Sequence, residues 1–249
     1  MKRLLFLVLL LSCQPREGIR TPIGNPSPPP LAEVPKADPP SYPWHRWEQS
    51  PLPITAAHFR CKGATTHPIK KVGEIYVADC RGSGGHSLPL IHGEPGVYPI
   101  LITLLNHVQE EFGRPVRVTC GHRCPTHNAY ADPSKRAQTS KHMIGAEVDF
   151  YVEGLEYEPE KVVESLIAYY KREGKFGPIQ RYEKGDTDVT TPPWYNREVF
   201  IKLYRAEEGR DGDNDHPYPY LAIQVRYDRG EEKAVIYTWE GANNSFLRE

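Results

Sequence analysis

The stretches Cys120-Gly-His-Arg-Cys-Pro-Thr-His-Asn128 and Ser140-Lys-His-Met-Ile-Gly-Ala-Glu-Val-Asp149 decide the fold of this chain. From residue 146 to residue 152, apolar side chains alternate with acidic or aromatic ones, which predicts a strand with one buried face. His142 precedes this strand, Asp149 lies within it, and Gly145 lets the backbone turn sharply between them. An imidazole nitrogen and a carboxylate could therefore converge on one metal ion. The alternative is a capped loop in which both side chains are merely hydrogen-bonded.

The flanking segments predict two helices and four further strands. Residues 97–112 carry apolar side chains at helical spacing and are followed by Gly113, a typical helix end. A second helix is expected over residues 160–172, strands over 116–119, 199–204, 220–227 and 234–239, and a polar loop over 120–141. The helices come early and the strands late, with hairpin-type links between the late strands. This order predicts an α+β domain with a largely antiparallel sheet.

The two quoted stretches resemble the signature of the D-alanyl-D-alanine zinc metallopeptidases. That signature reads roughly Ser-Gly-Tyr-Arg-Ser-Pro-x-x-Asn and then Ser-x-His-x-x-Gly-x-Ala-x-Asp. The matching positions here are Gly121, Arg123, Pro125, Asn128, Ser140, His142, Gly145 and Asp149. Ala146 stands one place earlier than the alanine of the family. The resemblance covers about residues 97–152 well and the C-terminal third poorly, and it implies a hedgehog-like, D-Ala-D-Ala peptidase-like fold.

The resemblance also implies a third zinc ligand, a histidine near the C-terminus that often has an acidic residue three positions before it. His216 is the only histidine downstream, and Asp213 lies three residues before it. In relatives, however, this histidine commonly lies on a strand. The equivalent strand here is expected over residues 221–226, where Gln224 occupies the position of the histidine. Gln224 would weaken or abolish zinc binding.

An intact site would be a catalytic Zn²⁺ centre held by His142, Asp149 and His216. The ion would activate a water molecule, and Asp213 would serve as general base. By resemblance, Arg123 would stabilise the scissile carbonyl or hold a substrate carboxylate, and Ser140 would orient the substrate. The expected activity is hydrolysis of peptidoglycan stem peptides, of the D-Ala-D-Ala carboxypeptidase or endopeptidase type. The alternatives are a wall-binding pseudoenzyme that has lost the zinc and a structural tether with an empty cleft.

Four cysteines lie in the expected globular part: Cys61, Cys80, Cys120 and Cys124. An even number of cysteines in an exported protein predicts two disulfides, for which three connectivities are possible. We favour Cys61–Cys80 and Cys120–Cys124, because each pair closes a short loop. Cys120 and Cys124 are also spaced like two metal ligands, but no matching second pair follows them.

The N-terminus has the features of an exported, lipid-anchored precursor. A short positive head and an apolar run at residues 4–11 indicate a signal peptide over residues 1–12, because the run is too short to span a bilayer. The run ends at Cys13 in a sequence that resembles a bacterial lipobox, which implies diacylation of Cys13. Ten of the thirty residues from Gln14 to Pro43 are proline, which predicts an extended tether within residues 13–50. Residues 51–249 would then form the peptidase-like domain.

The net charge and the sorting signal indicate which classes of partner this protein has. The net charge of −1 gives no electrostatic basis for binding nucleic acid. The expected partners are peptidoglycan stem peptides and, through the lipid anchor, a membrane. Gln14 after the lipidated cysteine favours, by resemblance, the periplasmic side of the outer membrane.

The acidic segment 211–215 lacks the ligand pattern of a calcium loop. Side chains of lower rank that could line the cleft are His86, His92, His122, His127, Trp194, Tyr195, Tyr218 and Tyr220.

Overall fold

The computed structural model describes residues 51–134, 138–183 and 187–248, which belong to one compact unit, Trp47–Glu249. The expected signal peptide, Cys13 and the proline-rich tether lie outside these residues. Among the described residues, no helix is both long enough and apolar enough to cross a membrane.

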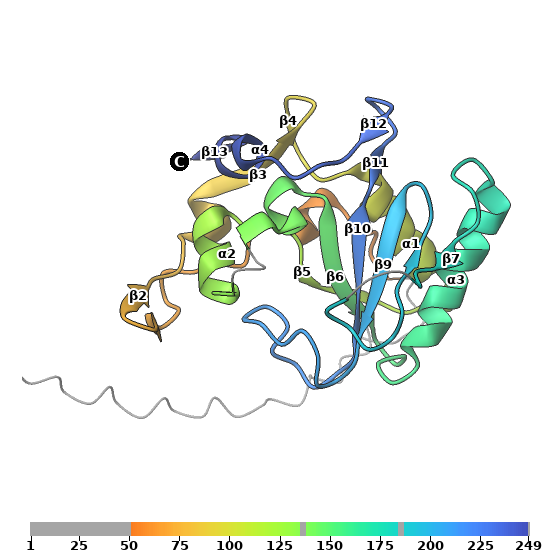
Figure 1. Ribbon diagram of the computed structural model, residues 1–249, viewed down its shortest axis with the longest axis horizontal. Coiled ribbons are helices and arrows are strands. Elements are labelled where there is room, and N and C mark those ends of the chain that lie inside the picture. Colours follow the sequence, from red (N-terminus) through yellow and green to blue (C-terminus); the bar gives the residue numbers. More distant parts are fainter. Residues whose placement is uncertain (1–50, 135–137, 184–186, 249) are drawn as a thin grey trace, which may run out of the picture. The chain divides into compact units, whose positions relative to one another are not determined.

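A six-stranded sheet forms the centre of the unit, and its neighbouring strands all run antiparallel. Its order is β5-β6-β10-β9-β8-β7. The strands are β5 (Val116–Cys120), β6 (Glu147–Val152), β7 (Gln180–Arg181), β8 (Trp194–Tyr195), β9 (Val199–Tyr204) and β10 (Tyr220–Val225). Figure 1 shows β6, β10 and β9 side by side in the middle of the unit.

Two long helices pack against each other and against this sheet. They are α1 (Pro99–Phe112) and α3 (Pro159–Glu173), and each begins with a proline and ends at a left-handed glycine. Proline fits the first helical turn because its missing N–H would have no helical partner there. The shorter helices are α2 (Pro125–Ala131) and α4 (Trp239–Asn244). Short 3-10 turns are η2 (Ala56–Phe59), η3 (Gly82–Gly84) and η5 (Lys141–Ile144).

Alternation along the central strands separates a buried core from a polar face. On β6, Val148, Phe150 and Val152 join the core with the apolar residues of α1 and α3, and on β10 the core residues are Leu221, Ile223 and Val225. Successive side chains of a strand point to opposite faces. Glu147 and Asp149 therefore face away from the helices, as do Ala222 and Gln224 on the neighbouring strand. The candidate site described below lies on this second face.

Smaller pieces of sheet surround the centre. They are β1 (Lys70–Val72) with β2 (Ile75–Val77), β3 (His86–Ile91) with β4 (Glu94–Pro95) and β13 (Phe246–Arg248), and β11 (Tyr227–Asp228) with β12 (Lys233–Ala234). β13 brings the C-terminal segment against the early strand β3.

The structure confirms the α+β class with mostly antiparallel pairing, and it corrects several details. The segment expected to be a polar loop contains α2, which Pro125 begins and the Cys124 side chain caps. The strand expected over residues 234–239 is reduced to β12, and α4 begins at Trp239 because the Thr238 side chain accepts from Gly241 N–H. β3 and β13 were not expected. Such short strands are set by tertiary pairing, and residues 86–91 contain one proline and two polar residues, which weakens any local pattern.

Gly121 provides a test of how closely the backbone packs beside the site. A Cβ atom at this position would lie 2.5 Å from the Phe59 Cα and 2.6 Å from the Phe59 carbonyl oxygen. Because the clash is with backbone, Gly121→Ala is expected to lower the free energy of unfolding by about 1–3 kcal/mol, measured by urea denaturation. The matched control is Gly84→Ala, since nothing lies within 4 Å of its Cβ position. Equal stability of the two variants would contradict the packing described here.

Candidate metal centre

A cavity of about 970 Å³ lies over the polar face of the sheet. Strands β6, β9 and β10, the η5 segment and the loop between β9 and β10 all contribute to its lining. The lining residues are Arg123, Ala131, Asp132, Pro133, Thr139, Ser140, Lys141, His142, Glu147, Asp149, Tyr182, Thr187, Asp188, Phe200, Lys202, Tyr204, Gly209, Arg210, Asp211, Tyr220, Gln224 and Arg226.

The η5 turn brings His142 to the start of β6. The Ser140 hydroxyl accepts a hydrogen bond from His142 N–H at 3.2 Å and so caps the turn. Gly145 ends the turn in the left-handed conformation, with φ 66°. A Cβ there would also lie 2.8 Å from the Pro89 side chain. Ser140 lines the cavity, but its capping bond orients His142.

The His142 ring is held so that one nitrogen faces two carboxylates. Nδ1 lies 2.7 Å from the Gly121 carbonyl oxygen, which can only accept, so Nδ1 carries the proton. Nε2 lies 3.4 Å from Asp149 Oδ2 and 3.8 Å from Glu147 Oε2. All three side chains are buried. A histidine fixed through Nδ1 to a carbonyl, with Nε2 free, has the arrangement of a metal-binding imidazole.

The electrostatics of this group favour a bound cation. Burial alone would lower the pKa of His142, but neighbouring negative charge, including that of Glu147 and Asp149, raises it well above its usual value. Two buried carboxylates beside one imidazole need a positive charge between them, which a protonated imidazole or a bound cation supplies. The residues present therefore fit a divalent cation at the Nε2 side of His142.

Asp149 has a further partner that the sequence analysis missed. Asn214 Nδ2 donates to Asp149 Oδ2 at 2.8 Å, and Asn214 Oδ1 accepts from the Thr119 hydroxyl at 2.6 Å. Asn214 is fully buried. A hydrogen-bonded carboxylate keeps one orientation, which is the role of outer partners around a metal. The acidic segment 211–215 was visible in the sequence, but no local pattern indicated that the Asn214 amide within it would reach β6.

Glu147 and Gln224 form a pair directly beside His142. They face each other across β6 and β10, and Gln224 Nε2 donates to Glu147 Oε1 at 2.7 Å. The other carboxylate oxygen, Oε2, is the one that faces His142. Glu147 stands where the family pattern has alanine, and Gln224 stands where a histidine was expected. The chain therefore departs from the family pattern twice at neighbouring positions: it has an acid in place of alanine on β6 and an amide in place of histidine on β10.

Cys120 also lies beside His142, but on the wrong side of the ring. Its Sγ atom is 3.3 Å from Nδ1, the nitrogen that donates to Gly121. Cys120, His142 and Asp149 lie close enough together to be a possible metal group. Burial raises the pKa of the Cys120 thiol to about 12. Because the Cys120 sulfur lies at the Nδ1 side of the ring, an ion bound at Nε2 would take its ligands from the carboxylates.

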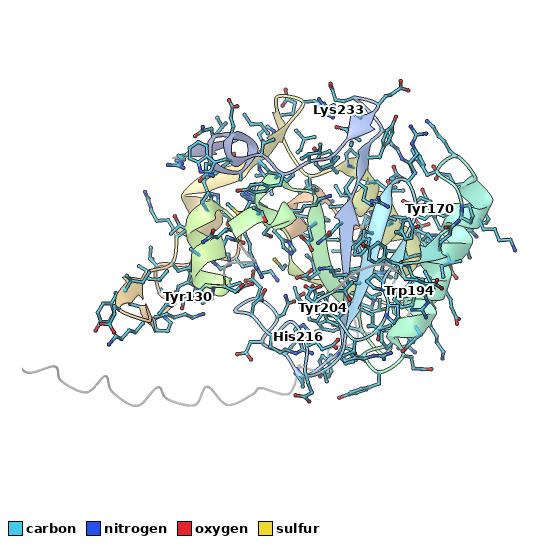
Figure 2. The ribbon with its side chains drawn as sticks, in the orientation of Figure 1. Tyr130, Tyr170, Trp194, Tyr204, His216 and Lys233 are labelled. Atoms are coloured by element: carbon cyan, nitrogen blue, oxygen red, sulfur yellow. The ribbon has the colours of Figure 1, made fainter. Side chains whose placement is uncertain are left out.

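His216 is not part of the close group that Cys120, His142 and Asp149 form among the described residues. Its ring packs against Tyr151 at 5.2 Å and Tyr220 at 5.7 Å between ring centroids, and it does not line the cavity. Along β6, His142 lies beside Glu147, whereas His216 lies beside Tyr151, four positions further on. Figure 2 shows His216 on the loop that joins β9 to β10, near Tyr204.

Arg123 and Asp213 form a buried ionic network. Arg123 Nε donates to Asp213 Oδ2 at 2.7 Å, and its terminal nitrogen donates to Asp211 at 2.6 Å. His127 links Asp213 to Asp79, at 3.0 and 2.7 Å. Burial would raise the pKa of Asp213, but the His127 hydrogen bond and the charge of Arg123 lower it well below its usual value. A carboxylate held in this way is a poor proton acceptor, and Asp213 does not line the cavity.

The remaining candidates have other surroundings. His92 pairs with Asp228 and Glu231, and His122 is buried against His86 and Phe246. Trp194 is buried under Arg181 in the core, Tyr195 lies beside Tyr182, and Tyr218 packs on His216. Tyr220 lines the cavity.

The arrangement of the cysteines differs from the expected disulfide pairing. All four described cysteines carry free thiols. Cys61 Sγ and Cys80 Sγ lie 3.8 Å apart, far beyond the 2.05 Å or so of a disulfide bond. Cys120 lies beside His142, whereas Cys124 packs with Cys61 and Cys80. The pairing of Cys120 with Cys124 fails because β5 and the start of α2 point the two side chains to different places.

Comparison with models of protein families gives a match over part of the chain. Residues 79–182 match the family model of Peptidase M15, and this segment contains His142, Glu147 and Asp149. No curated protein and no solved structure matches the chain significantly. The match agrees with the resemblance noted in the sequence: residues 79–182 are similar to the Peptidase M15 family of zinc D-Ala-D-Ala peptidases.

Proposed function

We propose that this protein is a zinc peptidase that hydrolyses peptidoglycan stem peptides at D-alanine linkages. The observation that carries the proposal is the buried group at the cavity floor, where His142 Nε2 faces Asp149 and Glu147 within a Peptidase M15 domain. The cavity volume of about 970 Å³ lies within the range of sites that take small molecules or short peptides.

His142, Asp149 and Glu147 are the residues that would hold the ion. Three protein ligands leave a position open, as in catalytic rather than structural zinc sites. Bound zinc would supply Lewis-acid chemistry and a water of lowered pKa. The chain's own contribution is orientation: Gly121 fixes the His142 ring, Asn214 fixes Asp149, and Gln224 fixes Glu147.

The cleft walls suit a substrate that carries both charges. Lys202 pairs with Asp188 and with the Tyr204 hydroxyl on one wall, and Asp211 and Arg226 lie elsewhere in the lining. Stem peptides present free carboxylates and amines to such groups. Arg123, by contrast, is engaged by Asp211 and Asp213, so we assign it a positioning role for the loop that carries Asn214.

The test is turnover of a peptide ending in D-Ala-D-Ala, compared with the same peptide ending in L-Ala-L-Ala. Zinc-loaded wild-type protein is expected to release D-alanine and to leave the L-isomer intact. His142→Ala is expected to lower turnover at least about 1,000-fold, because it removes a ligand that no other described nitrogen can replace. Full activity in this variant would contradict the proposal.

A second candidate function is a peptidoglycan-binding pseudoenzyme. It is favoured by Gln224 at the expected histidine position and by the engagement of Asp213 in an ionic network. A pseudoenzyme would be retained on purified sacculi without releasing any alanine. Failure to bind sacculi, together with absence of turnover, would instead favour a structural tether.

We further propose that Cys13 carries a lipid anchor and that the domain acts in the cell envelope, on the periplasmic side of the outer membrane. The Cys13→Ser variant is expected to move from the membrane fraction to the soluble fraction, because it lacks the site of lipid attachment and no described helix is long and apolar enough to cross a bilayer. Immunoblots of both fractions after a high-salt wash measure this change. A variant that still sediments with membranes would disprove the lipoprotein assignment.

A further inference from the structure

Three cysteines and one histidine from distant parts of the chain meet in a second buried cluster. Cys61 follows η2, Cys80 precedes η3, His86 begins β3, and Cys124 caps α2. One ligand atom from each lies within 4.8 Å of every other, and all four residues are buried. None of them lines the cavity described above.

The spacing within this cluster matches a tetrahedral metal site. Cys61 Sγ and Cys80 Sγ lie 3.8 Å apart, and Cys80 Sγ lies 3.7 Å from His86 Nε2. With zinc–sulfur bonds of about 2.3 Å, the edge between two sulfur ligands of a tetrahedron is about 3.8 Å. The ligand atom of Cys124 lies within 4.8 Å of each of the other three. We propose that Cys61, Cys80, His86 and Cys124 hold a structural zinc ion.

The surroundings of the ligand atoms support this assignment. His86 Nδ1 lies 3.1 Å from the Ser87 carbonyl oxygen, so the proton resides on Nδ1 and Nε2 is free to bind. Backbone N–H groups donate to two of the sulfurs, from Gly82 to Cys80 at 3.2 Å and from His127 to Cys124 at 3.4 Å. Such hydrogen bonds stabilise thiolates, the form in which cysteine binds metal.

The backbone is shaped around the cluster by two glycines. A Cβ at Gly63 would lie 2.2 Å from Cys80 Sγ, and a Cβ at Gly82 would lie 2.0 Å from the Gly63 carbonyl oxygen. Gly82 also has a φ of 68°. Both positions therefore exclude side chains, which brings the segments that carry Cys61 and Cys80 together.

A closed set of four ligands indicates a structural role. Four protein ligands leave no position for water, unlike the three proposed in the cleft. The ion would join the segment before α1 to the start of α2, where Cys124 adjoins Arg123. Zinc binding displaces the protons of three thiols, and its free energy adds to the stability of the fold. A Cys61–Cys80 disulfide would instead leave the Cys124 thiol without a partner of this kind.

The test is metal analysis of the purified protein in an Asp149→Ala background, which removes the proposed cleft ion. We expect about one equivalent of zinc to remain there, because the Cys3His set is complete without Asp149. Adding Cys61→Ser or His86→Ala to this background should lower the zinc content at least about tenfold and should also lower the melting temperature. The matched control is Cys120→Ser, a buried cysteine outside the set, which should leave the zinc in place.

Two measurements keep the test decisive when a variant fails to fold. A mercurial that modifies thiols should release the remaining zinc from the Asp149→Ala protein, and cobalt substitution should give thiolate-to-metal charge-transfer absorption. Metal-free protein, a Cys61–Cys80 disulfide found by mass spectrometry, or unchanged zinc in His86→Ala would each overturn the proposal. Loss of peptidase activity alone does not bear on it, because the cleft ion is removed separately.

Discussion

Glu147→Ala is expected to remove zinc from the cleft and to reduce peptide turnover to background. The variant loses the carboxylate whose Oε2 faces His142 at 3.8 Å, which leaves two protein ligands where zinc requires three or four. We expect zinc affinity at this site to fall at least about 100-fold, since loss of an outer partner alone costs 10- to 100-fold. Equilibrium dialysis with a zinc chelator measures the affinity.

A second substitution tests the geometry of this ligand set. Gln224 lies opposite Glu147 on β10, so Gln224→His in the Glu147→Ala background places an imidazole beside the alanine, as in the family pattern. This double variant is expected to recover cleft zinc. His216→Ala serves as the control, because the His216 ring packs among tyrosines outside the cavity. Loss of zinc in His216→Ala, with zinc retained in Glu147→Ala, would restore His216 as the third ligand.

Arg123→Ala is expected to lower the free energy of unfolding by about 3–5 kcal/mol. The guanidinium is buried between Asp211 and Asp213, and its removal leaves two carboxylates without their cation. The segment that carries Asn214 should then move away from Asp149, so cleft zinc affinity should fall as well. Urea denaturation and zinc titration measure the two effects.

The matched control for Arg123 is Arg117, which lies a few residues earlier, on β5. Arg117 pairs with Glu153 at the surface, and its side chain is 57% exposed. Arg117→Ala should therefore cost only about 0–1 kcal/mol. A similar small loss for Arg123→Ala, with zinc affinity unchanged, would show that the buried network does not support the site.

Much of the fold followed from local patterns. The alternation around Val148 and the helical spacing around Leu104 predicted β6 and α1, because a strand or helix with one buried face repeats its apolar residues at a fixed period. The same alternation placed Asp149 on the polar face. The short strands β3 and β13 had no such period, since their pairing joins residues about 160 positions apart.

The sequence by itself determined the α+β class, the Peptidase M15 resemblance and the pairing of His142 with Asp149. The class follows from apolar periods along the whole domain, whereas a turn, a glycine and a strand period between residues 140 and 149 are enough to pair His142 with Asp149. Only the tertiary structure decided which residues complete each site. Glu147 meets Gln224 through strand register, Asn214 reaches Asp149 from a distant loop, and three cysteines gather with His86 from separate segments. Contacts of this kind depend on how elements pack, and sequence spacing carries no record of that packing.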